Sequence, residues 1–128
     1  MVLDTSALAA IVFEEPPMTE LVAKLKAARD IQIGSPSYFE TRMVVLSRRG
    51  PDAVKRLERI LERSSTEVTE FTRDHAIAAT EAFQRFGKGR HPAGLNFGDC
   101  MAYAVAKVSG LPLLFTGDDF SKTDVEVA

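Results

Sequence analysis

Four carboxylates stand where a short apolar segment of the sequence meets a turn, and they are the side chains best suited to chemistry. Asp99 opens an apolar helix, Asp4 directly follows an apolar strand, and Glu40 and Asp119 occupy similar edges. Carboxylates within a few ångströms repel one another, so such a cluster is costly unless a divalent cation neutralises it. Oxygen ligands without a cysteine–histidine set favour Mg²⁺, with Mn²⁺ as a substitute, over Zn²⁺.

A carboxylate-bound metal ion is suited to phosphodiester hydrolysis, because it turns bound water into a nucleophile and stabilises the leaving oxygen. Other side chains near the acids fit a polyanionic substrate. The hydroxyls of Thr5 and Ser6 can hydrogen-bond a metal ligand or a phosphate oxygen, or can cap the helix that begins there. Lys88 and Arg90 lie in a glycine-rich loop. They either bind phosphate groups or belong to a solvated surface.

Each acid also has a purely structural interpretation. Asn96 and Asp99 are spaced like a capping box, Asp4 can cap the first helix, and Asp119 can be a solvated turn residue. Ser37 and Glu40 match a capping box outright, and for Glu40 alone a structural role is the simpler interpretation. Capping explains each acid separately, however, and does not predict that all of them fall at ends of elements able to converge.

The remaining polar and aromatic candidates are interpreted as structural. Phe83, Phe86 and Phe97 have the spacing of core residues rather than of a base-stacking platform. His75 stands near a helix start and is expected at the surface.

Length and composition indicate one domain spanning residues 1–128, which is large enough to bury a substantial core. The single cysteine cannot form an internal disulfide, and no apolar run approaches the ~18 residues of a membrane span. The start of the chain has no basic segment typical of a secretory signal, so a cytoplasmic protein with no membrane association is expected. The net charge of −2 gives no general attraction for nucleic acid, so local patches or metal must hold a polyanion.

Strands and helices alternate along the predicted chain. Strands are expected at residues 1–3, 31–33, 67–71 and 113–115, with a candidate edge strand at 125–127; helices are expected at 5–13, 19–28, 36–49, 52–63, 74–86 and 97–109. Ser35 is the predicted cap of the third helix, Gly50 and Pro51 are its predicted end, and Gly110 ends the last helix. Short apolar strands between helices predict an α/β fold, with a central, mostly parallel sheet flanked by helices. Ligands gather at the carboxyl ends of such strands, so the four acids are expected at one sheet edge.

Four segments together resemble a known family. They are Val-Leu-Asp-Thr-Ser-Ala-Leu (2–8), Ser-Tyr-Phe-Glu-Thr (37–41), Leu-Asn-Phe-Gly-Asp-Cys (95–100) and Pro-Leu-Leu-Phe-Thr-Gly-Asp-Asp-Phe (112–120). In this order and spacing they resemble PIN-domain ribonucleases, with the closest likeness to VapC-type toxins of bacterial toxin-antitoxin pairs. The resemblance covers essentially the whole chain and implies a PIN-like fold.

The resemblance also implies a function. It implies a magnesium-dependent endoribonuclease acting as a toxin on an RNA substrate, with Asp4, Glu40 and Asp99 as the acidic core of the metal site. It further implies a cognate antitoxin protein as partner, and a homodimer. The fourth acid lies in the Thr116–Phe120 turn, where this chain has one residue fewer between Thr and Asp-Phe than the commoner family pattern. Asp119 keeps its place beside Phe120 and is favoured, while Asp118 stays open.

Two other functions are compatible with parts of the sequence. A phosphotransferase of the haloacid-dehalogenase type also begins with an aspartate after the first strand, but it needs a second acid where this chain has Ser6. The stronger alternative is a PIN-like scaffold that binds RNA or a partner protein without cleavage. The intact set of acids argues against it, since a degenerate site would have lost a ligand.

Overall fold

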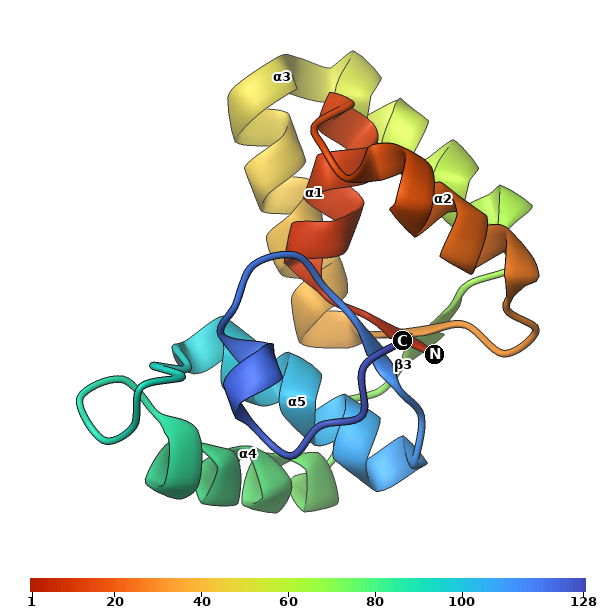
Figure 1. Ribbon diagram of the computed structural model, residues 1–128. Helices are drawn as coiled ribbons and strands as arrows, with labels where there is room; N and C mark the ends of the chain where they lie inside the picture. Colours follow the sequence, from red (N-terminus) through yellow and green to blue (C-terminus); the bar gives the residue numbers. More distant parts are fainter.

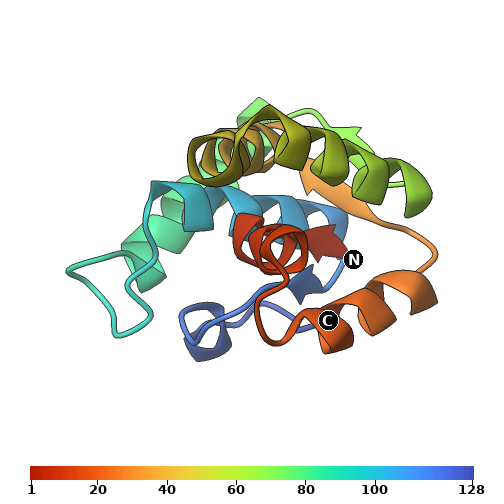
Figure 2. The same ribbon diagram turned by 90° about the horizontal axis from the view of Figure 1, so that it is seen from above.

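A parallel four-stranded sheet lies at the centre of the molecule (Figures 1 and 2). The computed structural model describes all 128 residues. The strands are β1 (Val2–Leu3), β2 (Gln32–Gly34), β3 (Glu67–Thr69) and β4 (Leu113–Leu114), in the spatial order β3-β2-β1-β4. β1 therefore lies between β2 and β4, although the latter two are 79 or more residues apart in the chain. This arrangement confirms the predicted α/β fold.

Five helices cover the two faces of the sheet. They are α1 (Thr5–Phe13), α2 (Met18–Ala27), α3 (Ser35–Arg63), α4 (Arg73–Phe86) and α5 (Phe97–Ser109), followed by a 3₁₀ turn, η1 (Phe120–Lys122). α1, α2 and α3 gather on one side, and α4 and α5 run side by side on the other (Figure 1). No helix combines the length and apolar character needed to cross a lipid bilayer.

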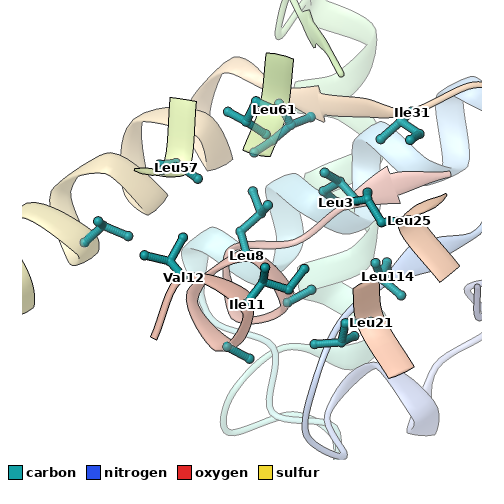
Figure 3. Packing of buried hydrophobic residues seen from close by; sticks show 14 of the residues in the cluster. Leu3, Leu8, Ile11, Val12, Leu21, Leu25, Ile31, Leu57, Leu61 and Leu114 are labelled. Carbon is teal, nitrogen blue, oxygen red and sulfur yellow. The ribbon is translucent and has the colours of Figure 1, made fainter. Parts of the chain in front are cut away.

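Successive side chains along each strand point to opposite faces of the sheet, so each face has its own apolar cluster. Leu3 and Leu114 point into the cluster that α1, α2 and α3 build, which Figure 3 shows from close by. Their neighbours Val2 and Leu113 point into the second cluster, formed with α4 and α5. All four side chains are almost fully buried. A two-residue strand with both residues apolar is therefore the sequence signature of a strand covered on both sides.

The third and fourth predicted helices follow one another directly and form the bent helix α3. At Gly50 the backbone leaves the helical conformation, with φ 76° and ψ −171°, and the helix resumes at Pro51. A positive φ is readily adopted only by glycine, and proline lacks the N–H that a continuous helix would need there. The predicted break is confirmed, but no loop separates the two halves.

Several predicted ends were wrong. Gly34, not Ser35, is the N-cap of α3, and no side chain caps this helix. The segment 125–127 contributes a single bridge, between Leu113 and Val127, rather than a strand. His75 is not at the surface: it is 6% exposed because its Nδ1 accepts a hydrogen bond from the Thr72 backbone N–H, closing a capping box at the start of α4.

Candidate active site

Asp4 joins the end of β1 to the start of α1, and its carboxylate is only 5% exposed. As the N-cap of α1 it accepts hydrogen bonds at Oδ2 from the Ser6 backbone N–H (2.9 Å) and the Ser6 hydroxyl (2.5 Å). Burial nevertheless raises the pKa of Asp4: the hydrogen bonds from Ser6 oppose the rise, and the charge of Glu40 adds to it. Capping therefore accounts for the hydrogen bonds, but not for a buried acid beside a second acid.

Glu40 lies one turn into α3 and is held from α1. The Thr5 hydroxyl donates to Glu40 Oε2 at 3.0 Å, and the Thr41 hydroxyl lies 3.1 Å from the Thr5 hydroxyl oxygen. Ser37 is buried inside the helix, and its carbonyl accepts a hydrogen bond from Thr41. The capping-box pattern of Ser37 and Glu40, the alternative to a cap at Ser35, is therefore not used in the structure. The carboxylate of Glu40 is positioned by tertiary contacts instead.

Gly98 provides the space for that carboxylate. A β-carbon built on Gly98 would stand 2.8 Å from Glu40 Oε2 and 3.0 Å from Oε1, closer than side chains normally approach. The Glu40 carboxylate of α3 therefore packs directly against Gly98 of α5. This contact joins the starts of the two helices.

Asp99 is the third residue of α5 and takes part in the predicted capping box. The Asn96 side chain accepts from the Asp99 N–H, and Asp99 Oδ2 accepts from the Asn96 N–H, each at 2.9 Å. Burial raises the pKa of Asp99 against the effect of the Asn96 hydrogen bond, and the charges of Asp4 and Asp119 raise it further. Asp99 is thus both a capping residue and a neighbour of two acids from other segments.

The fourth acid lies in the turn that follows β4. Ser6 accepts a hydrogen bond from the Thr116 backbone N–H at 3.0 Å, which ties this turn to the start of α1. Asp118 and Asp119 are both exposed, but only Asp119 contributes to the raised pKa of Asp99. Asp119 also precedes the buried ring of Phe120, which anchors this end of the turn. The effect of its charge on Asp99 therefore favours Asp119 over Asp118 as the fourth acid.

The chemistry of these donors fits a hard divalent cation. All four side chains offer only oxygen atoms, and two of them have raised pKa values that a nearby cation would lower. In the present side-chain conformations no three of the acids lie close enough to coordinate one ion. One oxygen of Asp4 and one of Asp99 are turned to their own helix starts. The second oxygen of each carboxylate has no such hydrogen bond, and joint coordination of one ion would require the acids to move closer together.

The predicted substrate-binding residues fall into two groups. The hydroxyls of Thr5 and Ser6 are engaged with Glu40, Asp4 and the Thr116 N–H, so in this structure they position the acids. Lys88 and Arg90 are exposed in the loop between α4 and α5, which the Gly87–Leu95 bridge closes at its base. The loop joins α4 to the helix that carries Asp99 (Figure 1).

Sequence reasoning missed two exposed aromatic rings on α4 and α5. Phe97 is 83% exposed and Phe83 is 42% exposed, so their assignment to the core was wrong; that of Phe86 was correct. Phe97 is the first residue of α5, and its exposure shows that no other segment covers this helix start.

Comparison with known proteins identifies the family to which this chain belongs. A family model described as the PIN domain matches residues 1–126. Ribonuclease VapC of Mycolicibacterium smegmatis is 48% identical over 126 residues, covering 98% of this chain and 97% of the relative. Ribonuclease VapC30 of Mycobacterium tuberculosis is 42% identical over 125 residues, covering 98% and 95%. The chain therefore belongs to the PIN-domain family, in its group of VapC ribonucleases.

A solved structure supports the fold independently. The crystal structure of VapC20 from Mycobacterium tuberculosis, described as a Sarcin-Ricin loop cleaving toxin, matches with a TM-score of 0.80 at 19% identity. The match covers 99% of this chain and 97% of that one. The predicted PIN-like fold is confirmed.

Proposed function

We propose that this chain is a magnesium-dependent endoribonuclease that hydrolyses phosphodiester bonds in RNA as the toxin of a toxin-antitoxin pair. One observation carries the proposal: Asp4 is buried at the end of the central strand, and its charge is coupled to Glu40 on α3 and to Asp99 on α5. A protein gains nothing in stability from placing these charges together without a cation. The names of its relatives, which are ribonucleases, support the same activity.

Asp4, Glu40, Asp99 and Asp119 would hold the metal ion, which is Mg²⁺ with Mn²⁺ as a substitute. When bound, the ion supplies an acidified water and a positive charge for the developing phosphate charge. The protein's own residues position the ligands. Ser6 orients Asp4, Thr5 orients Glu40, and the Asn96 backbone N–H orients the Asp99 carboxylate. Lys88 and Arg90 would attract the RNA backbone, which an overall charge of −2 does not.

The partners are proposed on the same basis. Solved structures of the same fold include a toxin-antitoxin complex from Klebsiella pneumoniae and VapBC2 from Rickettsia felis bound to a DNA fragment from their promoter. A cognate antitoxin is therefore proposed for this chain as well, and a homodimer as its assembly.

A cleavage assay tests the activity. The purified chain, freed of any partner, is incubated with RNA in Mg²⁺, in Mn²⁺ and in chelator, beside the variant Asp4→Asn. Cleavage by the wild type in either metal is expected, with none in chelator and at least a hundredfold less by Asp4→Asn. Asparagine keeps the shape of the side chain but not the charge that holds the metal. Equal cleavage in chelator would contradict metal dependence. RNA binding without cleavage under any condition would favour the scaffold alternative.

A further inference from the structure

An open apolar pocket of about 360 Å³ lies between α4 and α5. Seven of its eight lining residues are hydrophobic, and none of the eight is acidic. Phe83 and Ala79 contribute from α4, Phe97 and Met101 from α5, and Phe71 closes one end. We refer to it below as the α4–α5 pocket.

Two of the aromatic rings that line the pocket are exposed to solvent, which core packing does not explain. Phe97 is the most exposed large hydrophobic residue of the chain, and Phe83 is exposed over two-fifths of its surface. Both rings keep a face open to water, although burial of an aromatic side chain is strongly favourable. A group of exposed apolar side chains lining one hollow indicates a binding surface.

The pocket adjoins the acid cluster. Phe97 is the first residue of α5, and Asp99 is the third. Gly98 lies between them in the sequence, and the Glu40 carboxylate packs against it. A ligand held against Phe97 would therefore lie at the same helix start as Asp99, within one turn of that carboxylate along α5.

Charge at the edge of the pocket indicates which ligand fits. The Arg90 guanidinium lies over the Phe83 ring, 5.1 Å from its centroid, and Lys88 is exposed on the same loop. A flat, apolar group attached to an anion would place its face on the aromatic rings and its charge at these cations. A nucleobase attached to its phosphate has this chemistry, and bases stack on aromatic side chains in many single-stranded RNA complexes.

We propose that the α4–α5 pocket holds a base of the RNA substrate close to the bond that is cut, with Phe97 as the stacking residue. Phe83 forms a second wall, and Arg90 contacts the phosphate of the held nucleotide. The inference rests on the proposed ribonuclease activity and adds how the substrate is positioned. Phe97 is a positioning residue, since it touches no reacting atom.

Three substitutions at one position test the stacking. Phe97→Ala removes the ring, Phe97→Leu keeps an apolar side chain without a ring, and Phe97→Tyr keeps the ring. Val108→Ala, at an exposed position at the far end of α5, is the control. For cleavage of a single-stranded RNA oligonucleotide in Mg²⁺, KM should rise about 5- to 140-fold in the alanine variant, the range expected from loss of one stacked base. The leucine variant should lose nearly as much, while the tyrosine variant and the control should match the wild type. In the alanine and leucine variants kcat should change by less than KM.

A series of RNA oligonucleotides, each with one abasic nucleotide at a different position, identifies the base that the pocket holds. When the abasic position is moved along the oligonucleotide, one position near the cut should raise KM of the wild type as much as Phe97→Ala does. That position should have no further effect in Phe97→Ala, because the same contact is already lost. The other positions should affect both proteins equally.

The outcomes separate this inference from the proposed activity. Metal-dependent cleavage with the same KM in wild type and Phe97→Ala would overturn the base pocket and leave the ribonuclease in place. Unchanged KM with a smaller assembly in Phe97→Ala, measured by sedimentation, would assign the surface to a second copy of this chain. Full activity in Phe97→Leu would show that an apolar contact, not stacking, is used. If the wild type cuts no RNA, binding of the same oligonucleotide in chelator still tests the pocket, since Phe97→Ala should weaken it; equal binding there would overturn it.

Discussion

Glu40 lies directly over Gly98, and an added β-carbon on Gly98 would stand 2.8 Å from Glu40 Oε2. This relationship joins α3 to α5 at the acid cluster. One methyl group at Gly98 therefore forces the Glu40 carboxylate to move, because the three atoms nearest to it all belong to that carboxylate.

Gly98→Ala should therefore separate activity from stability. Alanine is the better helix former by about 0.5–1 kcal/mol, so thermal unfolding should occur at the same or a higher temperature. RNA cleavage should fall by roughly ten- to a hundredfold, because a ligand displaced by about an ångström no longer holds the reacting geometry. Ala102→Gly, in the interior of the same helix, is the reverse control, with lower stability expected. Full cleavage by Gly98→Ala would show that the position of Glu40 is not important.

Ser6 connects two of the acid-bearing segments, because its hydroxyl donates to Asp4 and accepts from the Thr116 N–H. Ser6→Ala leaves that N–H and one carboxylate oxygen without this partner, at a cost of about 1–3 kcal/mol in the free energy of unfolding. Cleavage should also fall, since both Asp4 and the turn of Asp119 lose their shared support. Chemical unfolding and RNA cleavage are measured on the same samples. Ser47→Ala, at an exposed position of α3, should change neither.

Lys88 and Arg90 should act through charge alone if they contact the RNA backbone. Replacing either with alanine should weaken binding of different single-stranded RNA sequences by similar factors. It should also reduce the slope of log K against log salt concentration by about 0.7, the value for one lost phosphate contact. Lys55→Ala, at an exposed position in the second half of α3, is the control. If the slope of log K against log salt concentration is unchanged in both variants, the loop does not contact RNA phosphates and is a solvated surface.

Asp124 gives stability a defined pH dependence. Its Oδ1 accepts from the buried Tyr103 hydroxyl, and its Oδ2 lies 3.1 Å from Arg85 and 3.5 Å from Lys107. Burial raises the pKa of Asp124, but the Tyr103 hydrogen bond and the charges of Lys107 and Arg85 outweigh that effect and hold it below the ordinary value. A carboxyl with a lowered folded pKa contributes stability above the unfolded pKa of about 3.9, and the contribution is lost as the pH falls through the folded pKa.

Tyr103→Phe should reveal this contribution. The variant should be less stable than the wild type by about 1.5–3 kcal/mol between pH 7 and pH 5, the size of a hydrogen bond to a charged group. The difference should shrink as the pH falls below about 4. Urea unfolding of both proteins across this range measures it. A difference that stays constant down to pH 3 would show that lost packing, rather than the ionised partner, causes the effect.

The sequence was sufficient to predict the elements and the order of the acids, because both depend on local pattern. Paired apolar residues such as Val2 and Leu3 identified strands buried on both faces, and the Gly50–Pro51 pair identified the bend in α3. The Asn96–Asp99 spacing identified the start of α5. Each of these signals lies within a few residues of the feature that it predicts.

Features that depend on tertiary contacts could not be predicted in this way. The hydrogen bond from Thr5 to Glu40 joins residues 35 positions apart, so the local Ser37–Glu40 pattern suggested a capping box that does not exist. The support of the Asp119 turn by Ser6 spans 110 positions. Phe97 has core-like spacing, but its helix start lies at the edge of the protein, and only the fold shows that nothing covers it.

The most direct test of the metal site is a pair of thermal melts for the wild type and Asp99→Asn, one in chelator and one in millimolar Mg²⁺. Asparagine can still accept the Asn96 hydrogen bond, so the helix cap should survive. In chelator the variant should melt no lower than the wild type, because burial and the charges of Asp4 and Asp119 disfavour the ionised Asp99, as its raised pKa indicates. With Mg²⁺ the order should reverse. The wild type gains about 2.7 kcal/mol at a hundredfold excess of metal over its dissociation constant, and the variant gains much less. An equal shift of both proteins on adding Mg²⁺ would contradict a metal site that includes Asp99.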